Sequence, residues 1–274
     1  MIQYAARKSS AHRTPFIASQ VRTLPSIVLF ILLLATSSFE IMGQEPVAKP
    51  PQILMVVPLG SIPGETLKLK ARGLNLDTAT DIKSNVPDVA VKFLAAGKTG
   101  VPASLNPQQA GDSQIEFEIA IPAGAGVDVV ELTCVTPEGQ ATYQLPVRSG
   151  EKIILETEPN AGFNQAHTIE LSQTVLGQIQ SPQDVDVFTI ELVEGTFVRI
   201  EVAAAEHGSA LDSLLTLYDA DGTQIARHDD RVPSRDSLIE WKVTKSGRYF
   251  VVVQDANDLG GEAQGYRLRV APMT

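Results

Sequence analysis

Apolar and polar residues alternate one by one along several short stretches of the chain. The stretches in which apolar side chains take every second position are residues 67–71, 115–121, 130–134, 188–192, 198–202, 239–243, 249–253 and 266–270. A period of two is that of a β-strand, because successive side chains point to opposite faces of a sheet. One apolar face and one polar face indicate antiparallel strands that are buried on one side. The pattern therefore predicts an all-β protein built from β-sandwiches.

Glycine and proline separate these stretches and mark the turns between strands. Pro63-Gly64 and Pro137-Glu138-Gly139 are turn sequences in the first half of the chain. In the second half, Asp219 to Gly222 predicts a hairpin turn, with glycine at the position of positive φ. A chain of 274 residues is long enough for two compact β domains. We predict a first sandwich over residues 52–148 and a second over residues 150–274.

The N-terminal segment has the order of a secretory signal. Its first 25 residues contain basic side chains and no Asp or Glu, and they precede an apolar run at residues 27–35 and then small residues. The run is about half of the roughly 20 residues required to cross a bilayer, so we expect cleavage, with an uncleaved anchor as the alternative. Cleavage falls near Ser37 or near Gly43. We assign residues 1–43 to the signal peptide and residues 44–51 to a flexible lead-in, and we predict a secreted, periplasmic or cell-surface protein without stable membrane insertion after cleavage.

Charge and cysteine content narrow the classes of ligand. The formal net charge is -10, and an acidic surface repels nucleic acid and anionic lipid, so we expect no nucleic acid partner and favour cations as small ligands. Cys134 is the only cysteine, which excludes an intrachain disulfide and a multi-cysteine metal site. No cysteine lies beside the signal segment, which disfavours a lipid-anchored lipoprotein. Because Cys134 occupies an apolar position of its stretch, we predict that it lies in the core.

Residues for catalysis do not form a recognisable pattern. His167, His207 and His228 are the only histidines after the signal segment, and none lies in a motif. Gly-x-Ser-x-Gly, His-Glu-x-x-His and P-loop patterns are absent. Aromatic residues make up 5% of the chain and Trp241 is the single tryptophan, which leaves little surface for stacking on sugars. We predict that the chain is not an enzyme; carboxylates that converge in a deep pocket would favour the alternative, an enzyme with an unrecognised site.

The start of the first sandwich carries a second kind of signal. An apolar run begins at Ile53, contains Pro58 and Gly60, and ends at Pro63-Gly64. Further along, Gly73 to Leu76 follows a predicted strand. In these features the segment resembles IPT/TIG-type immunoglobulin-like domains. The resemblance implies a spacer or an interaction surface.

Several motifs of the second sandwich follow one another in a fixed order. They are Glu156 to Asn160, Gly177-Gln178-Ile179, Asp184 to Phe188, Leu211 to Asp219, Asp229-Asp230 and Gly247-Arg248-Tyr249. In these motifs the chain closely resembles bacterial pre-peptidase C-terminal (PPC) domains. The resemblance implies a jelly-roll-like β-sandwich that accompanies secreted peptidases or other exported proteins. It also implies an accessory module and not a catalyst.

The same resemblance implies a calcium site at the start of the second sandwich. Carried over residue by residue, the ligands are Glu156, Glu158 and Asn160, with Asp186 as a further ligand and Asp184 as an additional candidate. Calcium accepts about six to eight oxygen ligands from carboxylates, amides and the backbone. Ala161 and Gln183 depart from the pattern of the relatives at two positions. The alternative is an acidic linker that closes onto the sandwich with a turn at Pro159.

A second acidic set lies on predicted loops and strand ends. It consists of Asp212, Asp229, Asp230 and Asp255. Because Asp stabilises turns through its own backbone, we assign this set to turns and solvated surface, with a second ion site as the weaker hypothesis. Collagen-binding relatives use exposed aromatic residues, whereas Tyr218, Phe250 and Tyr266 mostly occupy apolar positions here, so we do not expect collagen binding.

Together these features predict an exported, non-catalytic binding protein with calcium as the cofactor of its second sandwich. The expected partner is an extracellular or periplasmic protein or polysaccharide. The alternative is an accessory or targeting module that works with a separate secreted peptidase.

Overall fold

A computed structural model of the chain describes residues 49–273. The predictions of a signal peptide at residues 1–43 and of most of the lead-in lie outside the described residues. Within the described part, no helix has both the length and the apolar character that crossing a membrane requires. Lys49 to Pro51 precede the first strand without regular structure.

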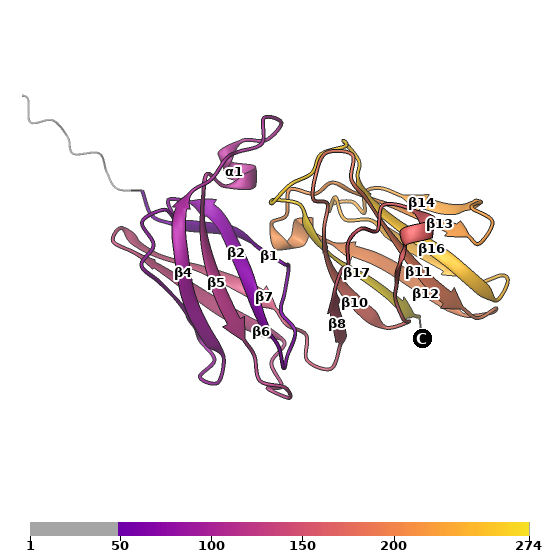
Figure 1. The fold of residues 1–274 in the computed structure, drawn as a ribbon, viewed down its shortest axis with the longest axis horizontal. Helices are drawn as coiled ribbons and strands as arrows, with labels where there is room; N and C mark the ends of the chain where they lie inside the picture. The colour runs from indigo at the N-terminus through magenta and orange to yellow at the C-terminus, as the bar shows by residue number, and fades with distance from the viewer. Residues whose placement is uncertain (1–48, 274) are drawn as a thin grey trace, which may run out of the picture. The chain divides into compact units, whose positions relative to one another are not determined.

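The first half of the described chain folds into two sheets that share one core (Figure 1). Its elements are β1 Gln52–Val57, β2 Thr66–Leu74, β3 Asp81–Ser84, β4 Ala90–Lys98, α1 Pro107–Ala110, β5 Ser113–Ala120, β6 Val129–Thr136 and β7 Gly139–Pro146. One sheet has the order β1-β2-β5-β4 and the other the order β3-β6-β7. Leu69 and Phe117 of one sheet join Leu132 of the other in a single buried cluster. This half is therefore a β-sandwich.

The second half forms a larger sandwich of two five-stranded sheets. Its elements are β8 Lys152–Leu155, η1 Phe163–Gln165, β9 His167–Thr168, β10 Gln173–Gln178, β11 Val185–Leu192, β12 Phe197–Ala203, η2 Ala205–His207, β13 Ser213–Asp219, β14 Gln224–His228, β15 Leu238–Lys242, β16 Gly247–Asp255 and β17 Gly265–Pro272. The sheet orders are β15-β12-β17-β10-β8 and β14-β13-β16-β11-β9. Ile200 and Leu268 of the first sheet pack with Phe188 and Val251 of the second in one core.

The observed strands confirm the all-β prediction. In β5, buried residues alternate with half-buried ones along the whole strand, as the period of two requires. Cys134 is buried and free, as predicted. The predicted hairpin turn joins β13 and β14, where Gly222 has φ 81° and the Asp219 side chain accepts a hydrogen bond from the N–H of Thr223 at 2.8 Å.

Two short edge strands correct the expectation of purely antiparallel sheets. β8 pairs in parallel with β10, and β9 pairs in parallel with β11. The alternation of side chains fixes which face of a strand is buried, but it does not fix the direction of its partner. These two strands matter for the site, because the segment between them carries three of the predicted calcium ligands, Glu156, Glu158 and Asn160.

Candidate metal centre

The segment that follows β8 is fixed to both sheets of the second sandwich. The N–H of Glu156 donates to the C=O of Leu176 in β10 at 3.0 Å, which continues the pairing of β8. Four residues later, the C=O of Asn160 accepts a hydrogen bond from the N–H of Val187 in β11, also at 3.0 Å. These two backbone contacts hold the intervening residues across one end of the sandwich.

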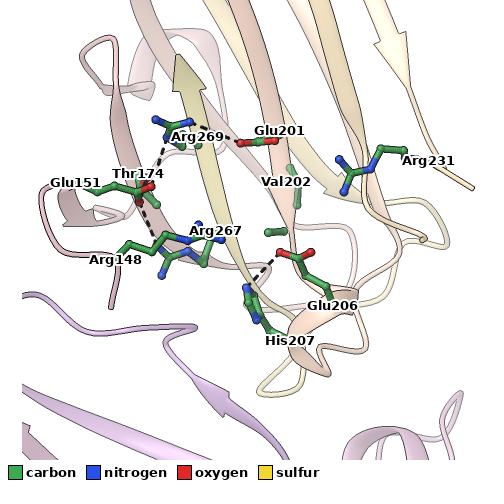
Figure 2. A pocket seen from close by; sticks show the side chains of 11 residues that line it. Arg148, Glu151, Thr174, Glu201, Val202, Glu206, His207, Arg231, Arg267 and Arg269 are labelled. Atoms are coloured by element: carbon green, nitrogen blue, oxygen red, sulfur yellow. Dashed lines mark hydrogen bonds and ion pairs between the residues drawn. The ribbon is translucent and has the colours of Figure 1, made fainter. Parts of the chain in front are cut away.

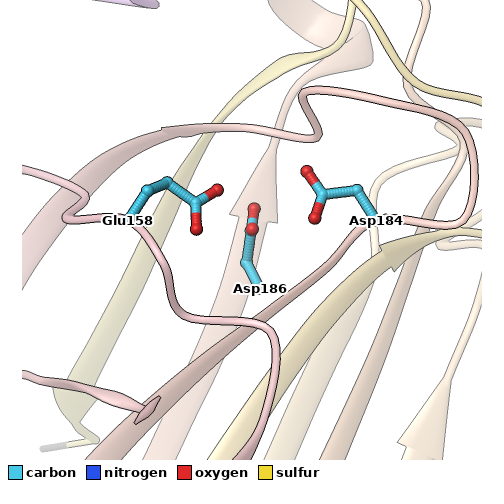
Figure 3. Close-up of side chains that lie close together, drawn as sticks. All are labelled: Glu158, Asp184 and Asp186. Carbon is cyan, nitrogen blue, oxygen red and sulfur yellow. The ribbon is translucent and has the colours of Figure 1, made fainter.

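Three carboxylates meet beside this segment. Glu158, Asp184 and Asp186 each place one carboxylate oxygen within 4.8 Å of the others, and their carboxyl groups point toward one another in Figure 3. Calcium binds oxygen at about 2.3–2.6 Å, so two ligands of one ion lie at most about 5 Å apart. The spacing of the three carboxylates therefore suits a single calcium ion. Glu158 is exposed, Asp184 half-buried and Asp186 buried, so the group extends from the surface inward.

Buried polar atoms beside the carboxylates lack partners. Asn160 is 0% exposed, yet neither its Oδ1 nor its Nδ2 has a hydrogen-bond partner among the described residues. Oδ1 of Asp186, which is also 0% exposed, has none either. Buried side-chain polar atoms are satisfied in most native proteins. The residues present therefore fit a cation, which would accept the amide oxygen and the carboxylate oxygen together.

The hydroxyl group of Tyr266 links Glu156 to Asp186, one of the three carboxylates. It donates to Oδ2 of Asp186 at 2.6 Å and lies 3.1 Å from Oε2 of Glu156. The other oxygen of Glu156 accepts the N–H of Gln178 at 2.7 Å. Glu156 is thus connected to the three carboxylates through Tyr266 and is not one of the mutually close group.

Gly177 makes room for this arrangement. A side chain on Gly177 would overlap the ring and the hydroxyl of Tyr266, and its Cβ would lie 2.7 Å from Oε2 of Glu156. Only glycine allows the strand β10 to pass this close to the buried tyrosine and carboxylate. The motif Gly177-Gln178-Ile179 therefore has a steric reason at its first position.

The carboxyl groups are held in an environment that disfavours their charge. Burial raises the pKa of Glu156, and the neighbouring Asp186 raises it further. Burial also raises the pKa of Asp186, with added repulsion from Asp184 and Glu158 and an opposing hydrogen bond from Tyr266. None of the groups that contribute most to either shift is a lysine or an arginine. The centre therefore gains stability from a proton or from a bound cation.

A hollow lies beside part of the centre. It has a volume of about 270 Å³ and is lined in part by Glu156, Glu158 and Gly177, whereas Asp184 and Asp186 do not line it.

The second acidic set is only partly brought together. Asp212, Asp229 and Asp230 each place a carboxylate oxygen within 4.8 Å of the others, and the last two are exposed. Asp255 is buried next to Asp212, whose backbone N–H donates to its Oδ2 at 3.1 Å, and its Oδ1 accepts the backbone N–H groups of Asn257 at 2.9 Å and Leu259 at 3.1 Å. Those contacts are the ones that a turn-stabilising aspartate makes.

Two residues of the centre were not predicted as part of it. Tyr266 was predicted to lie in the core, where it is, but its hydroxyl bridges Glu156 and Asp186 from 110 and 80 residues away in the chain. Gly177 belongs to the motif Gly177-Gln178-Ile179, but no role was predicted for it. A tyrosine on the buried face of a strand was the available signal, since a buried hydroxyl requires a hydrogen-bond partner.

Comparisons with known proteins identify part of the second sandwich. The family described as bacterial pre-peptidase C-terminal domain matches residues 184–255. The match includes Asp184 and Asp186 and begins after Glu156, Glu158 and Asn160. A probable subtilase-type serine protease of Deinococcus radiodurans is 36% identical over 105 residues, which are 37% of this chain and only 14% of that protein.

Solved structures match parts of the chain at low sequence identity. The pre-peptidase C-terminal domain of collagenase from Bacillus anthracis covers 42% of this chain with 99% of its own length, at 18% identity and a TM-score of 0.33. The secreted serine protease VesC from Vibrio cholerae covers 78% of this chain with 48% of its own, at 11% identity and a TM-score of 0.29. The family match is the most specific of these findings: residues 184–255 of this chain match the bacterial pre-peptidase C-terminal domain family.

Proposed function

We propose that this chain is an exported, non-catalytic binding module whose second sandwich holds a calcium ion. The ligands would be oxygen atoms of Glu158, Asn160, Asp184 and Asp186, with Glu156 connected to them through Tyr266. The observation that carries the proposal is the fully buried side chain of Asn160, whose Oδ1 has no partner, together with the unpartnered Oδ1 of Asp186. Burying an amide or a carboxylate without a partner is costly, and a cation removes that cost for both.

The donor set favours calcium over other metals. All four side chains offer oxygen and none offers nitrogen or sulfur as a ligand, which disfavours zinc and copper. Calcium tolerates mixed carboxylate and amide ligands in flexible geometry, whereas magnesium requires near-octahedral geometry and keeps several waters. The exposed position of Glu158 leaves room for water to complete the coordination.

The ion would act on structure and electrostatics. It would join the segment after β8 to the start of β11, and its charge would offset the repulsion that raises the pKa of the buried carboxyl groups. The residues of this chain would supply the oxygen ligands, and Tyr266 would hold Asp186 in place through its hydroxyl. A stiffened segment would present the second sandwich to a partner in a fixed orientation relative to its own linker.

Thermal unfolding of the purified chain in excess calcium and in chelator tests the site. A ligand that binds only the folded state stabilises it by about 2.7 kcal/mol at about 100 times its dissociation constant. We expect calcium to raise the unfolding temperature of the wild-type chain, and Glu158→Gln to lose most of the rise. Glu194→Gln is the matched control, because Glu194 is exposed in the same sandwich and outside the centre. A wild-type chain that unfolds at the same temperature in calcium and in chelator would reject the site.

A second candidate function concerns the partner. The description of the matched family and the identity to a segment of a probable subtilase-type protease support an accessory or targeting module for a separate secreted peptidase. Capture experiments on culture medium, with the chain as bait and in calcium, would discriminate. Retention of a peptidase supports the accessory role, and retention of another extracellular protein or of polysaccharide supports the general binding module.

A further inference from the structure

Several basic side chains line one pocket on the second sandwich. It has a volume of about 240 Å³, and Arg148, Arg231, Arg267, Arg269 and His207 line it (Figure 2). We call it the arginine pocket. It is an exception on a chain with a formal net charge of -10. Glu151, Glu201 and Glu206 also line it, so its arginines outnumber its carboxylates by one. An excess of one sign of charge in a concave site favours a ligand of the opposite sign.

Two of these arginines already have protein partners. Arg267 is 5% exposed and donates to the C=O of Leu59 at 3.0 Å and to Glu151 at 3.3 Å. Arg269 lies 3.7 Å from Glu151 and 3.8 Å from Glu201, but it makes no hydrogen bond to either, and its buried Nε has no acceptor among the described residues. Arg267 is therefore held by Leu59 and Glu151, whereas Glu151 and Glu201 satisfy Arg269 only in part.

The other two arginines have no such partners. Arg148 and Arg231 are exposed, and within the described part of the chain neither side chain forms an ion pair or a hydrogen bond. Figure 2 shows Arg148 beside Arg267 on one side of the pocket and Arg231 on the other, with Glu201 and Glu206 between them. The positive charges of Arg148 and Arg231 add to those of Arg267 and Arg269, which line the same pocket. Burial lowers the pKa of Arg267, and repulsion by Arg148 lowers it further against the attraction of Glu151.

His207 lies among groups of both signs of charge. Burial lowers its pKa most, Glu206 and Asp236 raise it, and Arg267 and Arg148 lower it. A neutral imidazole at neutral pH leaves the 3.4 Å contact with Glu206 without a full ion pair. An anion in the pocket would offset the repulsion between Arg148 and Arg267.

We propose that the arginine pocket binds an oxyanion group, carried by a small molecule or by the end of a larger ligand, between Arg148, Arg231 and Arg269. Guanidinium groups match phosphate, sulfate and carboxylate oxygens with paired hydrogen bonds. A water molecule takes about 30 Å³ of liquid volume, so the pocket has room for one oxyanion and a few attached atoms. The proposal is independent of the calcium centre, whose residues do not line this pocket.

Calorimetric titration of the purified chain with potassium phosphate, sulfate and succinate tests the proposal, at constant ionic strength and in buffer freed of divalent cations by resin. We expect saturable binding of at least one anion, weakened about tenfold or more by Arg148→Gln and by Arg231→Gln. Arg227→Gln is the matched control, because Arg227 is exposed on the same sandwich, outside the pocket. Both substituted arginines are exposed, and an unchanged unfolding temperature would show that the variants fold.

The outcomes separate the sources of the oxyanion. Binding of phosphate or sulfate alone supports a tetrahedral oxyanion as the natural group, and binding of succinate alone supports a carboxylate. Either result supports the pocket when the two arginine variants weaken it and the control does not. The proposal is overturned if none of the three anions binds up to tens of millimolar, or if Arg227→Gln weakens binding as much as Arg148→Gln, which would indicate diffuse screening.

Discussion

The hydroxyl group of Tyr266 can be removed from the candidate metal centre with little other disturbance. Tyr266→Phe keeps the buried ring in the core and deletes the oxygen that lies 2.6 Å from Asp186 and 3.1 Å from Glu156. The substitution leaves both carboxyl groups in place. It therefore tests whether the hydroxyl stabilises buried charge at this position.

The structure sets the size of the expected effect. A hydrogen bond to a charged group contributes about 1.5–3 kcal/mol, and the retained ring prevents the larger cost of a cavity. We expect Tyr266→Phe to lower the free energy of unfolding by about 2 kcal/mol in chelator. For a folded unit the size of residues 49–273, a loss of about 2 kcal/mol corresponds to a drop of roughly 4–8 °C in the unfolding temperature. The loss should grow with pH, because ionised carboxyl groups depend more on the donor.

Tryptophan fluorescence during urea unfolding measures the stability of the second sandwich, which contains Tyr266. Trp241 is the single tryptophan, lies in β15 and packs against the core of the second sandwich, with its ring 5.2 Å from that of Tyr249. Its emission therefore reports the unfolding of the second sandwich alone. The midpoint and slope of the transition give the free energy of unfolding for each variant.

Tyr218→Phe is the matched control for this measurement. Tyr218 lies in the same sandwich and is half-buried, but its hydroxyl has no hydrogen bond to another described residue. We expect the control to change stability by less than about 0.5 kcal/mol. If Tyr266→Phe is as stable as this control at alkaline pH in chelator, the hydroxyl does not support the carboxyl groups and the reasoning is wrong.

Two further predictions concern the same centre. Gly177→Ala should destabilise the second sandwich by about 1–3 kcal/mol, because the added Cβ overlaps Tyr266; Gly162→Ala, where nothing lies within 4 Å, serves as the control in the same urea titration. The raised pKa values of Glu156 and Asp186 mean that the folded chain retains protons which the unfolded chain releases. In chelator the free energy of unfolding should therefore fall as pH rises from about 5 to about 8, and excess calcium should flatten that slope; an equally steep slope in calcium would show that no ion replaces the protons.

Much of the fold was predictable because many strands have one polar face. β5 and β6 show this most clearly, since their buried residues alternate with more exposed ones. The alternation of apolar and polar residues did not predict β13, because its first five residues are all buried and the strand has no polar face there. The parallel pairing of β8 and β9 was also unpredictable from the pattern, since a period of two carries no information about strand direction.

The candidate site was predictable to a different extent. The acidic residues could be named from a resemblance in sequence, and the structure brings Glu158, Asp184 and Asp186 within 4.8 Å of one another. What the sequence could not indicate is that Tyr266 lies between carboxyl groups that are distant along the chain. Contacts of that kind depend on how β10, β11 and β17 pack, which alternation alone does not specify.

The energetics of the centre connect these observations. A buried carboxylate without a cationic partner destabilises a fold, so the group around Asp186 is stable when it carries a proton or faces a cation. Protons meet this need at low pH, where the raised pKa values keep the carboxyl groups neutral. At neutral or alkaline pH only a cation can do so, and the oxygen ligands suit calcium. Calcium should therefore bind more tightly as pH rises, with release of protons, and the calcium-dependent part of stability should be greatest where the chelated chain is weakest.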